Sequence, residues 1–384
     1  PPRSTPLYSS AASDVYKRQL LGYVSEVNKN DMKKDKYYRI GDLIGRQGIE
    51  EYYENYLRGT KGKKIYQKDR FNRIIGSYEE GKYDVPEQGA QNLVLTIDRE
   101  LQKYGEELLQ NKRGGIVAIE PKTGEVLSLV SAPNYDPSLL VGRKRSKNYR
   151  ELALDTLAKP LFDRGLLAQY APGSPFKTLN ALIALQEGVI DAETVYLCKK
   201  GHYYARGMFM DCNCRMGTKN NLLTGIFRSC NTYFANIYRR IIDQSGDNVE
   251  DGMNIWNRHL KSFGLGNYLG YDLPTGKKGF IPDAEYYNYW YKKGGWKSAT
   301  VVSNAIGQGE LLATPIQMAN FTAAIANRGY YIKPHFLKSV SNGTAEKLYE
   351  KIFRLYWWTD SPRLSCGIFY SCISDDFSSA IKLS

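Results

Sequence analysis

Apolar residues recur at helical spacing in three stretches of the chain, and each apolar face is wide enough for a buried helix. The first stretch runs from Ser174 to Gly188, the second from Ile226 to Ile241 and the third from Thr314 to Gly329. A hydroxyl residue followed by proline favours a helix start, and glycine favours a helix end. The apolar positions include Phe176, Leu179, Leu182, Ile183 and Leu185; Cys230, Tyr233, Phe234 and Ile237; and Met318, Phe321 and Ile325.

Shorter apolar runs of strand length precede these helices. Residues 93–97 form one run, after which Asp98 is placed to cap a helix. Residues 115–119 and 126–130 flank the turn 121–124, which ends in glycine, so they predict a β-hairpin. This order of elements predicts a sheet covered by helices, in an α+β or mixed fold.

Composition divides the N-terminal part of the chain into two segments. Residues 1–19 are rich in serine, alanine and proline and have no apolar period, so we expect a disordered or foreign segment. Residues 20–92 are rich in tyrosine, lysine and glycine, and only residues 48–57 there predict a helix. Residues 20–92 are therefore expected to form a small extended module outside the main domain. Within the main domain, residues 132–169 are polar and predict an irregular segment.

Charge and length narrow the classes of protein. The 384 residues carry a net charge of +13, which favours anionic partners. The basic residues are scattered and no base-stacking motif accompanies them, so we expect no nucleic acid among the partners. No apolar run reaches the length of about 18 residues needed to cross a bilayer. Six cysteines are too few for a disulfide scaffold of this size.

Ser174 and Lys177 are the first candidates for chemistry. Residues three apart on a helix share a face, so the lysine amine lies within reach of the serine hydroxyl. Ser174 is the expected N-cap, where the helix dipole favours an oxyanion. The pair therefore offers a nucleophile and a base, although a serine and proline at a helix start are commonly structural.

Ser229 and Asn231 are the second pair, expected just inside the start of the helix that ends near Ile241. A hydroxyl and a carboxamide two residues apart can point into one cleft, the first to pass protons and the second to bind a substrate amide. Alone this pattern carries little weight, but its order after the first pair and its place at a helix start strengthen it.

Ser-x-x-Lys followed by Ser-x-Asn resembles two-thirds of the signature of penicillin-binding transpeptidases and serine β-lactamases. Further blocks resemble the penicillin-binding branch, and the earliest ones resemble the non-catalytic pedestal of its elongation-type class B enzymes. The resemblance covers roughly residues 20–345. It implies a pedestal or dimerisation module over 20–92 and a transpeptidase domain over 93–345. The resembling blocks are 46–50, 56–59, 115–127, 132–137, 306–309 and 314–319.

The third motif of that family, Lys-Thr-Gly, occurs only as Lys122-Thr123-Gly124. This copy precedes Ser174 and occupies the predicted hairpin turn, whereas the family's working copy follows Ser-x-Asn on a sheet edge. We therefore interpret it as a turn. After about Asn342 the resemblance stops, and we expect residues 346–384 to form an unmatched tail that is either native or foreign to the protein. We expect a truncated fragment with unrelated sequence at both ends.

The resemblance implies acyl transfer. Ser174 attacks a terminal D-Ala-D-Ala peptide or a β-lactam, neutral Lys177 accepts the proton, Ser229 relays it to the leaving amine, and Asn231 binds the substrate amide. No cofactor is required. The third-motif strand supplies one oxyanion donor, whose loss typically costs about 10²–10³ in rate. We predict that this reaction is the gene's function and that this particular chain is inactive.

The same resemblance implies a cell-wall setting. The partners would be peptidoglycan stem peptides, lipid-linked precursor, β-lactams and a membrane glycosyltransferase of the elongation machinery. The protein would act at the periplasmic face of the inner membrane. The alternatives are a D,D-carboxypeptidase or β-lactamase, in which water is the acceptor, and a β-lactam-sensing or scaffolding protein without turnover.

Soft ligands lie between the two motifs. Cys198, His202, Cys212 and Cys214 suit tetrahedral zinc, as some elongation-type relatives have a metal-ligand cluster in this interval. Asp211 is a possible substitute for His202. The alternatives are a Cys198–Cys212 disulfide and unpaired thiols. Cys230 is interpreted as a small apolar filler.

Overall fold

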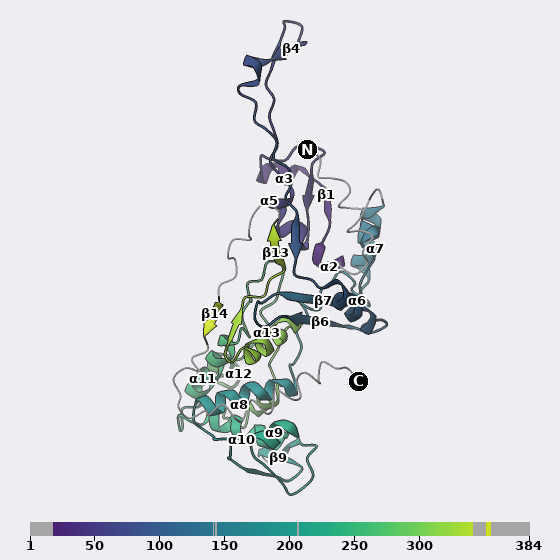
Figure 1. Ribbon diagram of the computed structural model, residues 1–384. Helices are drawn as coiled ribbons and strands as arrows, with labels where there is room; N and C mark the ends of the chain where they lie inside the picture. The colour runs from purple at the N-terminus through teal and green to yellow at the C-terminus, as the bar shows by residue number, and fades with distance from the viewer. Residues whose placement is uncertain (1–17, 141, 143, 206, 341–350, 355–384) are drawn as a thin grey trace.

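The structure is a computed structural model that describes residues 18–140, 142, 144–205, 207–340 and 351–354. It is elongated, with a narrow N-terminal part that carries a projecting hairpin and a wider part in which helices pack together (Figure 1). Every helix among the described residues is too short or too polar to cross a bilayer.

The N-terminal module is built from short elements. Strands β1 and β2 pair antiparallel, and so do β3 and β4. The helix predicted over residues 48–57 is confirmed, but it breaks at Tyr53, whose hydroxyl donates to the buried Asp272 at 2.5 Å. The elements are α2 (Arg18–Leu21), β1 (Val24–Glu26), α3 (Lys29–Lys34), β2 (Leu43–Gly45), α4 (Gly48–Tyr52), α5 (Glu54–Leu57), β3 (Tyr66–Lys68), β4 (Ile74–Ser77) and η2 (Tyr78–Gly81).

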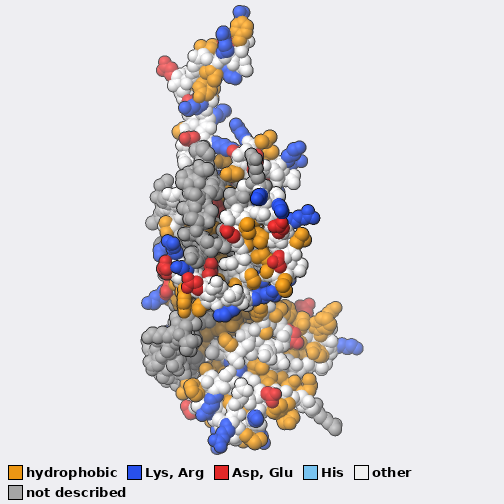
Figure 2. All heavy atoms as spheres, turned by 90° about the vertical axis from the view of Figure 1, so that its right-hand side faces the viewer, with side chains coloured by type: hydrophobic (Ala, Val, Ile, Leu, Met, Phe, Trp, Pro, Cys, Tyr) orange, Lys and Arg blue, Asp and Glu red, His pale blue; other side chains and the backbone are white. Residues whose placement is uncertain are grey.

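The β3–β4 hairpin projects away from the rest of the described chain (Figure 1). Figure 2 shows that hydrophobic and basic side chains alternate over its surface. Its exposed large apolar residues are Tyr66, Phe71, Ile74 and Ile75.

The second part contains five antiparallel strand pairs among the described residues. The hairpin predicted around residues 121–124 is confirmed as β6 and β7, and Lys122–Gly124 lies in its turn. The pairs are β5 (Leu93–Leu95) with β13 (Leu337–Val340), β6 (Gly114–Ile119) with β7 (Val126–Ala132), β8 (Tyr196–Cys198) with β11 (Thr218–Asn220), β9 (Gly201–Ala205) with β10 (Met208–Asp211), and β12 (Tyr330–Ile332) with β14 (Lys351–Arg354).

Helices pack together below β6 and β7 in Figure 1, and this combination of strands and helices agrees with the predicted α+β fold. The helix predicted after Asp98 is confirmed as α6, with the Asp98 carboxylate accepting from Leu101 N–H at 2.8 Å. The helical elements are α6 (Arg99–Leu108), η3 (Pro137–Leu140), α7 (Arg145–Leu154), η4 (Ser174–Phe176), α8 (Lys177–Gln186), α9 (Leu222–Phe227), α10 (Asn231–Ile242), α11 (Val249–Ser262), α12 (Ala284–Tyr291), η5 (Val302–Ile306) and α13 (Pro315–Ala326).

The structure differs from the sequence prediction at several elements. Helix α7 interrupts the segment predicted as irregular and buries none of its residues, so it has no apolar period to reveal it. Strand β14 lies within the segment 346–384 that we set apart as a tail, and it pairs with β12. The rest of that tail and residues 1–17 lie outside the described residues.

The core lies where α8, α10, α11 and η5 meet. Phe176 and Trp256 are fully buried, with ring centroids 6.2 Å apart, and the Tyr238 ring lies 5.3 Å from Trp256. Because Phe176 directly precedes α8, Tyr238 lies in α10 and Trp256 lies in α11, this packing fixes the three helices relative to one another.

Candidate active site

The turn that carries Ser174 is not the capped helix start that the sequence predicts. Gly173 holds the N-cap position with φ 68° and ψ −155°, a conformation open essentially to glycine. Ser174 begins the 3₁₀ turn η4, and its side chain makes no capping hydrogen bond. The N-cap prediction for Ser174 is therefore wrong, because Gly173 takes the non-helical position. The Ser174 hydroxyl is left available to other groups.

Lys177 lies at the first position of α8 and is 3% exposed. Its Nζ lies 3.2 Å from Ser174 Oγ, 2.8 Å from Ser229 Oγ and 2.6 Å from Asn231 Oδ1. It also lies 2.8 Å from the backbone oxygen of Ser229. The structure thus brings together all four side chains that the sequence analysis selects as catalytic candidates.

Burial makes Lys177 easier to deprotonate than an exposed lysine. Burial lowers the pKa of Lys177 from 10.5 to about 8, although nearby cysteine thiols act in the opposite direction. A neutral amine offers two N–H donors and one lone pair. The carbonyl of Ser229 and Oδ1 of Asn231 are pure acceptors for those donors, which leaves the lone pair for a serine hydroxyl proton. This geometry suits Lys177 to accept a proton from Ser174.

Ser229 lies outside the helix in which the sequence analysis expected it. It sits between α9 and α10 with φ 49°, an uncommon conformation for a residue with a side chain. Helix α10 begins at Asn231, with Cys230 as its N-cap. The Asn231 side chain also donates to the backbone oxygen of Asp211 at 2.7 Å, which fixes its orientation.

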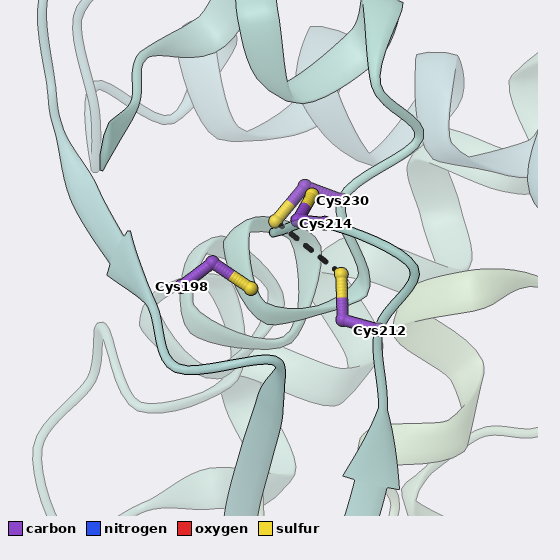
Figure 3. Close-up of side chains that lie close together, drawn as sticks. All are labelled: Cys198, Cys212, Cys214 and Cys230. Carbon is purple, nitrogen blue, oxygen red and sulfur yellow. Dashed lines mark hydrogen bonds between the residues drawn. The ribbon is translucent and has the colours of Figure 1, made fainter. Parts of the chain in front are cut away.

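Four buried cysteines form a second cluster directly beside this site (Figure 3). The sulfur atoms of Cys198, Cys212, Cys214 and Cys230 all lie within 4.8 Å of one another. Cys230 lies between Ser229 and Asn231 in the chain. Its two neighbours contact Lys177, whereas the Cys230 side chain belongs to the thiol cluster.

The thiol cluster differs from the ligand set that the sequence predicts. His202 is not in the group, and its Nε2 is buried with no hydrogen-bond partner among the described residues. Cys230 stands in its place, because the chain turns before α10 and directs this side chain toward the other thiols. Asp211 contributes only its backbone oxygen to the neighbouring site. All four cysteines are free, so the alternative Cys198–Cys212 disulfide is not formed.

The four sulfur atoms fit the requirements of a tetrahedral zinc ion. Ligands about 2.3 Å from zinc stand roughly 3.8 Å apart at the corners of a tetrahedron. The Cys212 and Cys230 sulfur atoms are 3.7 Å apart. Burial raises the pKa of Cys212, but hydrogen bonds from the backbone N–H groups of Cys214 and Thr232 and from the Cys214 and Cys198 side chains together hold that pKa at about 7. A thiol of this kind is readily deprotonated for a metal.

A Ser-x-x-Lys helix start facing a Ser-x-Asn helix start is the arrangement that the resemblance described above predicts for a penicillin-binding enzyme. The family model "Penicillin binding protein transpeptidase domain" matches residues 114–361, and "Penicillin-binding Protein dimerisation domain" matches residues 12–95. The chain belongs to the penicillin-binding protein transpeptidase family.

Similar proteins point to one branch of this family. The chain is 35% identical to peptidoglycan D,D-transpeptidase MrdA of Acinetobacter baumannii over 83% of this chain and 46% of that protein. It is 34% identical to MrdA of Escherichia coli K12 over 87% of this chain and 51% of that protein. The chain thus spans about half the length of these curated relatives.

Solved structures agree in fold. Pseudomonas aeruginosa PBP2 in complex with WCK 5153 is 30% identical, has a TM-score of 0.72, and is matched over 87% of this chain and 67% of its own. PBP2 of Helicobacter pylori in complex with MreC is 26% identical, has a TM-score of 0.77, and is matched over 90% of this chain and 60% of its own.

Proposed function

We propose that this protein is a peptidoglycan D,D-transpeptidase of the elongation type, which cross-links stem peptides through an acyl-enzyme on Ser174. The observation that carries the proposal is the contact of one buried amine, Lys177 Nζ, with Ser174 Oγ, Ser229 Oγ and Asn231 Oδ1. The names of the relatives agree with it.

Each of the four side chains has a distinct role in the proposed reaction. Ser174 Oγ attacks the carbonyl of a terminal D-Ala-D-Ala bond while Lys177 Nζ takes its proton. Ser229 Oγ, within hydrogen-bond reach of the same amine, passes the proton to the departing D-Ala amine. Asn231 binds the substrate amide with a side chain that Asp211 already orients. A neighbouring stem amine then attacks the ester and releases Ser174.

Oxyanion stabilisation requires two N–H donors. The backbone N–H of Ser174 is the first, and in the resembled family the second comes from the strand that carries Lys-Thr-Gly. Residues Lys122–Gly124 lie in the β6–β7 turn, so we do not assign them to the site. Loss of a single such donor typically costs about 10²–10³ in rate. An experiment can therefore test the site by adding a strand that carries Lys-Thr-Gly.

Fluorescent penicillin labelling tests the proposal. We compare this chain with an extended protein in which residues 341–384 are replaced by the Lys-Thr-Gly segment of the Escherichia coli relative. We expect stoichiometric label on Ser174 in the extended protein, none in its Ser174→Ala variant, and little or none in the chain alone. A folded extended protein without label on Ser174 would overturn the proposal. Product analysis with a D-Ala-D-Ala peptide and an acceptor amine separates cross-linking from hydrolysis, and absence of turnover would favour a sensor.

We further propose that Cys198, Cys212, Cys214 and Cys230 hold one structural zinc ion. The ion would tie the β8–β11 region to the start of α10 and would take no part in acyl transfer. Support comes from four buried sulfur atoms within 4.8 Å of one another.

Metal analysis of protein purified without chelator tests the zinc proposal. We expect one zinc per chain, and loss of zinc with a lowered melting temperature in Cys198→Ser. Cys366 and Cys372 serve as controls, because their substitution should leave the zinc content unchanged. Folded wild-type protein without zinc would end the proposal.

The setting proposed for this protein is the periplasmic face of the inner membrane, beside a peptidoglycan glycosyltransferase. Solved relatives include PBP2 bound to MreC and a peptidoglycan synthase complex. In this proposal residues 20–92 form a pedestal and residues 93–345 the transpeptidase domain. Co-purification of the protein with a glycosyltransferase from membranes tests the partner.

A further inference from the structure

The turn that presents Ser174 is held from outside its own helix. Gly173 N–H donates to the backbone oxygen of Gly307 at 2.8 Å. The preceding segment is also fixed to the same region, because Tyr170 and Ala313 exchange backbone hydrogen bonds of 2.9 and 2.8 Å. Since the Ser174 side chain makes no capping bond, the position of this turn depends on the segment that follows η5.

Gly307 packs directly against the same turn. It has φ 69°, and a Cβ atom added there would lie 2.2 Å from Gly173 O and 2.7 Å from Phe176 Cβ. Both contacts are far inside van der Waals distance, and both involve atoms that cannot rotate away. Only glycine therefore allows this close approach of the two backbones.

Asn180 ties the other end of the Ser174 segment to the same element. Its side chain is fully buried, and Nδ2 donates to the backbone oxygens of Asn304 at 3.2 Å and Ala305 at 2.9 Å. Its Oδ1 accepts from Trp256 Nε1 at 2.8 Å. Residues 304–307 thus hold the turn at Gly173 and the helix at Asn180, on both sides of Ser174 and Lys177.

We propose that Gly307 and Asn180 are positioning residues that set the approach of Ser174 Oγ to Lys177 Nζ. Neither belongs to the four side chains that meet at the amine. The three hydrogen bonds that residues 304–307 accept act as a clamp: the two from Asn180 fix α8, and the one from Gly173 fixes the turn that carries the Ser174 hydroxyl. The catalytic consequence rests on the function proposed above, whereas the structural clamp can be tested without it.

The direct test is hydrogen exchange on this chain with matched glycine variants. Gly307→Ala is compared with Gly246→Ala, since Gly246 has φ 68° and a Cβ there meets nothing within 4 Å. We expect exchange in residues 173–176 to rise at least about tenfold in Gly307→Ala, with residues 231–242 unchanged and Gly246→Ala equal to wild type throughout. Wild-type exchange in residues 173–176 of Gly307→Ala would overturn the proposal.

Asn180→Leu is the second variant, in case Gly307→Ala does not fold. It keeps the branched shape and the number of heavy atoms of the side chain and removes the bonds to residues 304 and 305. We expect the same local increase in exchange, together with an upfield shift of the Trp256 indole proton in NMR spectra. Unchanged exchange in residues 173–176, with the indole shift present, would show that the clamp does not hold the turn and would overturn the proposal.

Acylation of the extended protein distinguishes positioning from a purely structural role, because a purely structural role would not change the acylation rate constant separately from penicillin binding. We expect Gly307→Ala to lower the acylation rate constant by about 100-fold while non-covalent penicillin binding stays within about threefold. Gly246→Ala should change neither. Equal losses in the two glycine variants, or a loss confined to binding, would contradict positioning. Absence of acylation in the parent protein would instead count against the proposed function, and the exchange results would still decide the clamp.

Discussion

Helices α8 and α13 begin with the same kind of sequence and use it differently. Each start has a hydroxyl residue followed by proline, and in each the residue three positions later reaches back to that hydroxyl. At α13, Gln317 and Thr314 form a capping box, in which Gln317 Oε1 accepts from Thr314 N–H at 3.0 Å. At α8, Lys177 Nζ lies 3.2 Å from Ser174 Oγ, and no side chain caps the helix.

The difference shows how a hydroxyl at a helix start becomes available for chemistry. Thr314 is fully buried, and its hydroxyl is engaged with the backbone and side chain of Gln317. Ser174 gives up that capping role because Gly173 and the contact with Gly307 hold its turn instead. Its hydroxyl therefore faces an amine whose pKa burial has lowered to about 8.

The largest expected effect comes from replacing the residue that reaches back at α8. In the extended protein, Lys177→Met should lower acylation of Ser174 by about 10²–10⁴, the usual contribution of a general base. The matched variant Gln317→Met should be acylated at close to the wild-type rate as long as it is folded. The measurement is the rate of fluorescent penicillin labelling. Retained acylation in Lys177→Met would remove the proposed base.

Gln317→Met, which should leave acylation unchanged, should lower the stability of the fold. Gln317 Nε2 donates to the backbone oxygens of Gly264, Asn267 and Lys278, so Gln317→Met removes these bonds together with the capping box and leaves the buried Gly264 carbonyl without this donor. We expect a loss of roughly 2–4 kcal/mol in the free energy of unfolding. Denaturant unfolding measures it. A variant as stable as wild type would mean that this helix start is not held by its capping box.

The smallest expected effects are the changes in the free energy of unfolding when the Thr314 and Ser174 hydroxyls are removed. Thr314→Ala should cost about 0.5–2 kcal/mol, because it removes an N-cap side chain. Ser174→Ala should change the free energy of unfolding by less than about 0.5 kcal/mol, since its hydroxyl caps nothing. Thermal and denaturant unfolding of the two variants side by side checks the contrast. Equal losses would show that Ser174 also has a capping role.

Local signals in the sequence predicted the parts of the fold that depend on local chemistry. Asp98 as a cap for α6, the turn ending in Gly124 and the Thr314-Pro315 start of α13 were all confirmed. Helix α7 escaped prediction because it buries no residue and therefore has no apolar stripe. Such an exposed helix gives the sequence no period to detect.

The sequence predicted which residues form the candidate site but not how the chain places them. The spacing of Ser174 and Lys177 and the order of the two motifs selected the four side chains that meet. The break before α10, which gives Ser229 φ 49° and directs Cys230 to the thiols, depends on tertiary contacts. The sequence did contain a signal that Cys230 could join the other thiols. If Ser229 and Asn231 face one cleft, the residue between them must point away from it.

The most direct test of a freed hydroxyl beside a neutral amine is an NMR titration of Lys177 in this chain, with Lys177→Met identifying the resonance. Burial disfavours the charged amine, so the proton should leave at lower pH than from an exposed lysine. We predict a midpoint at about pH 8, below the ordinary 10.5, with neutral amine available to accept the Ser174 proton above it. A midpoint at the ordinary value would contradict the account.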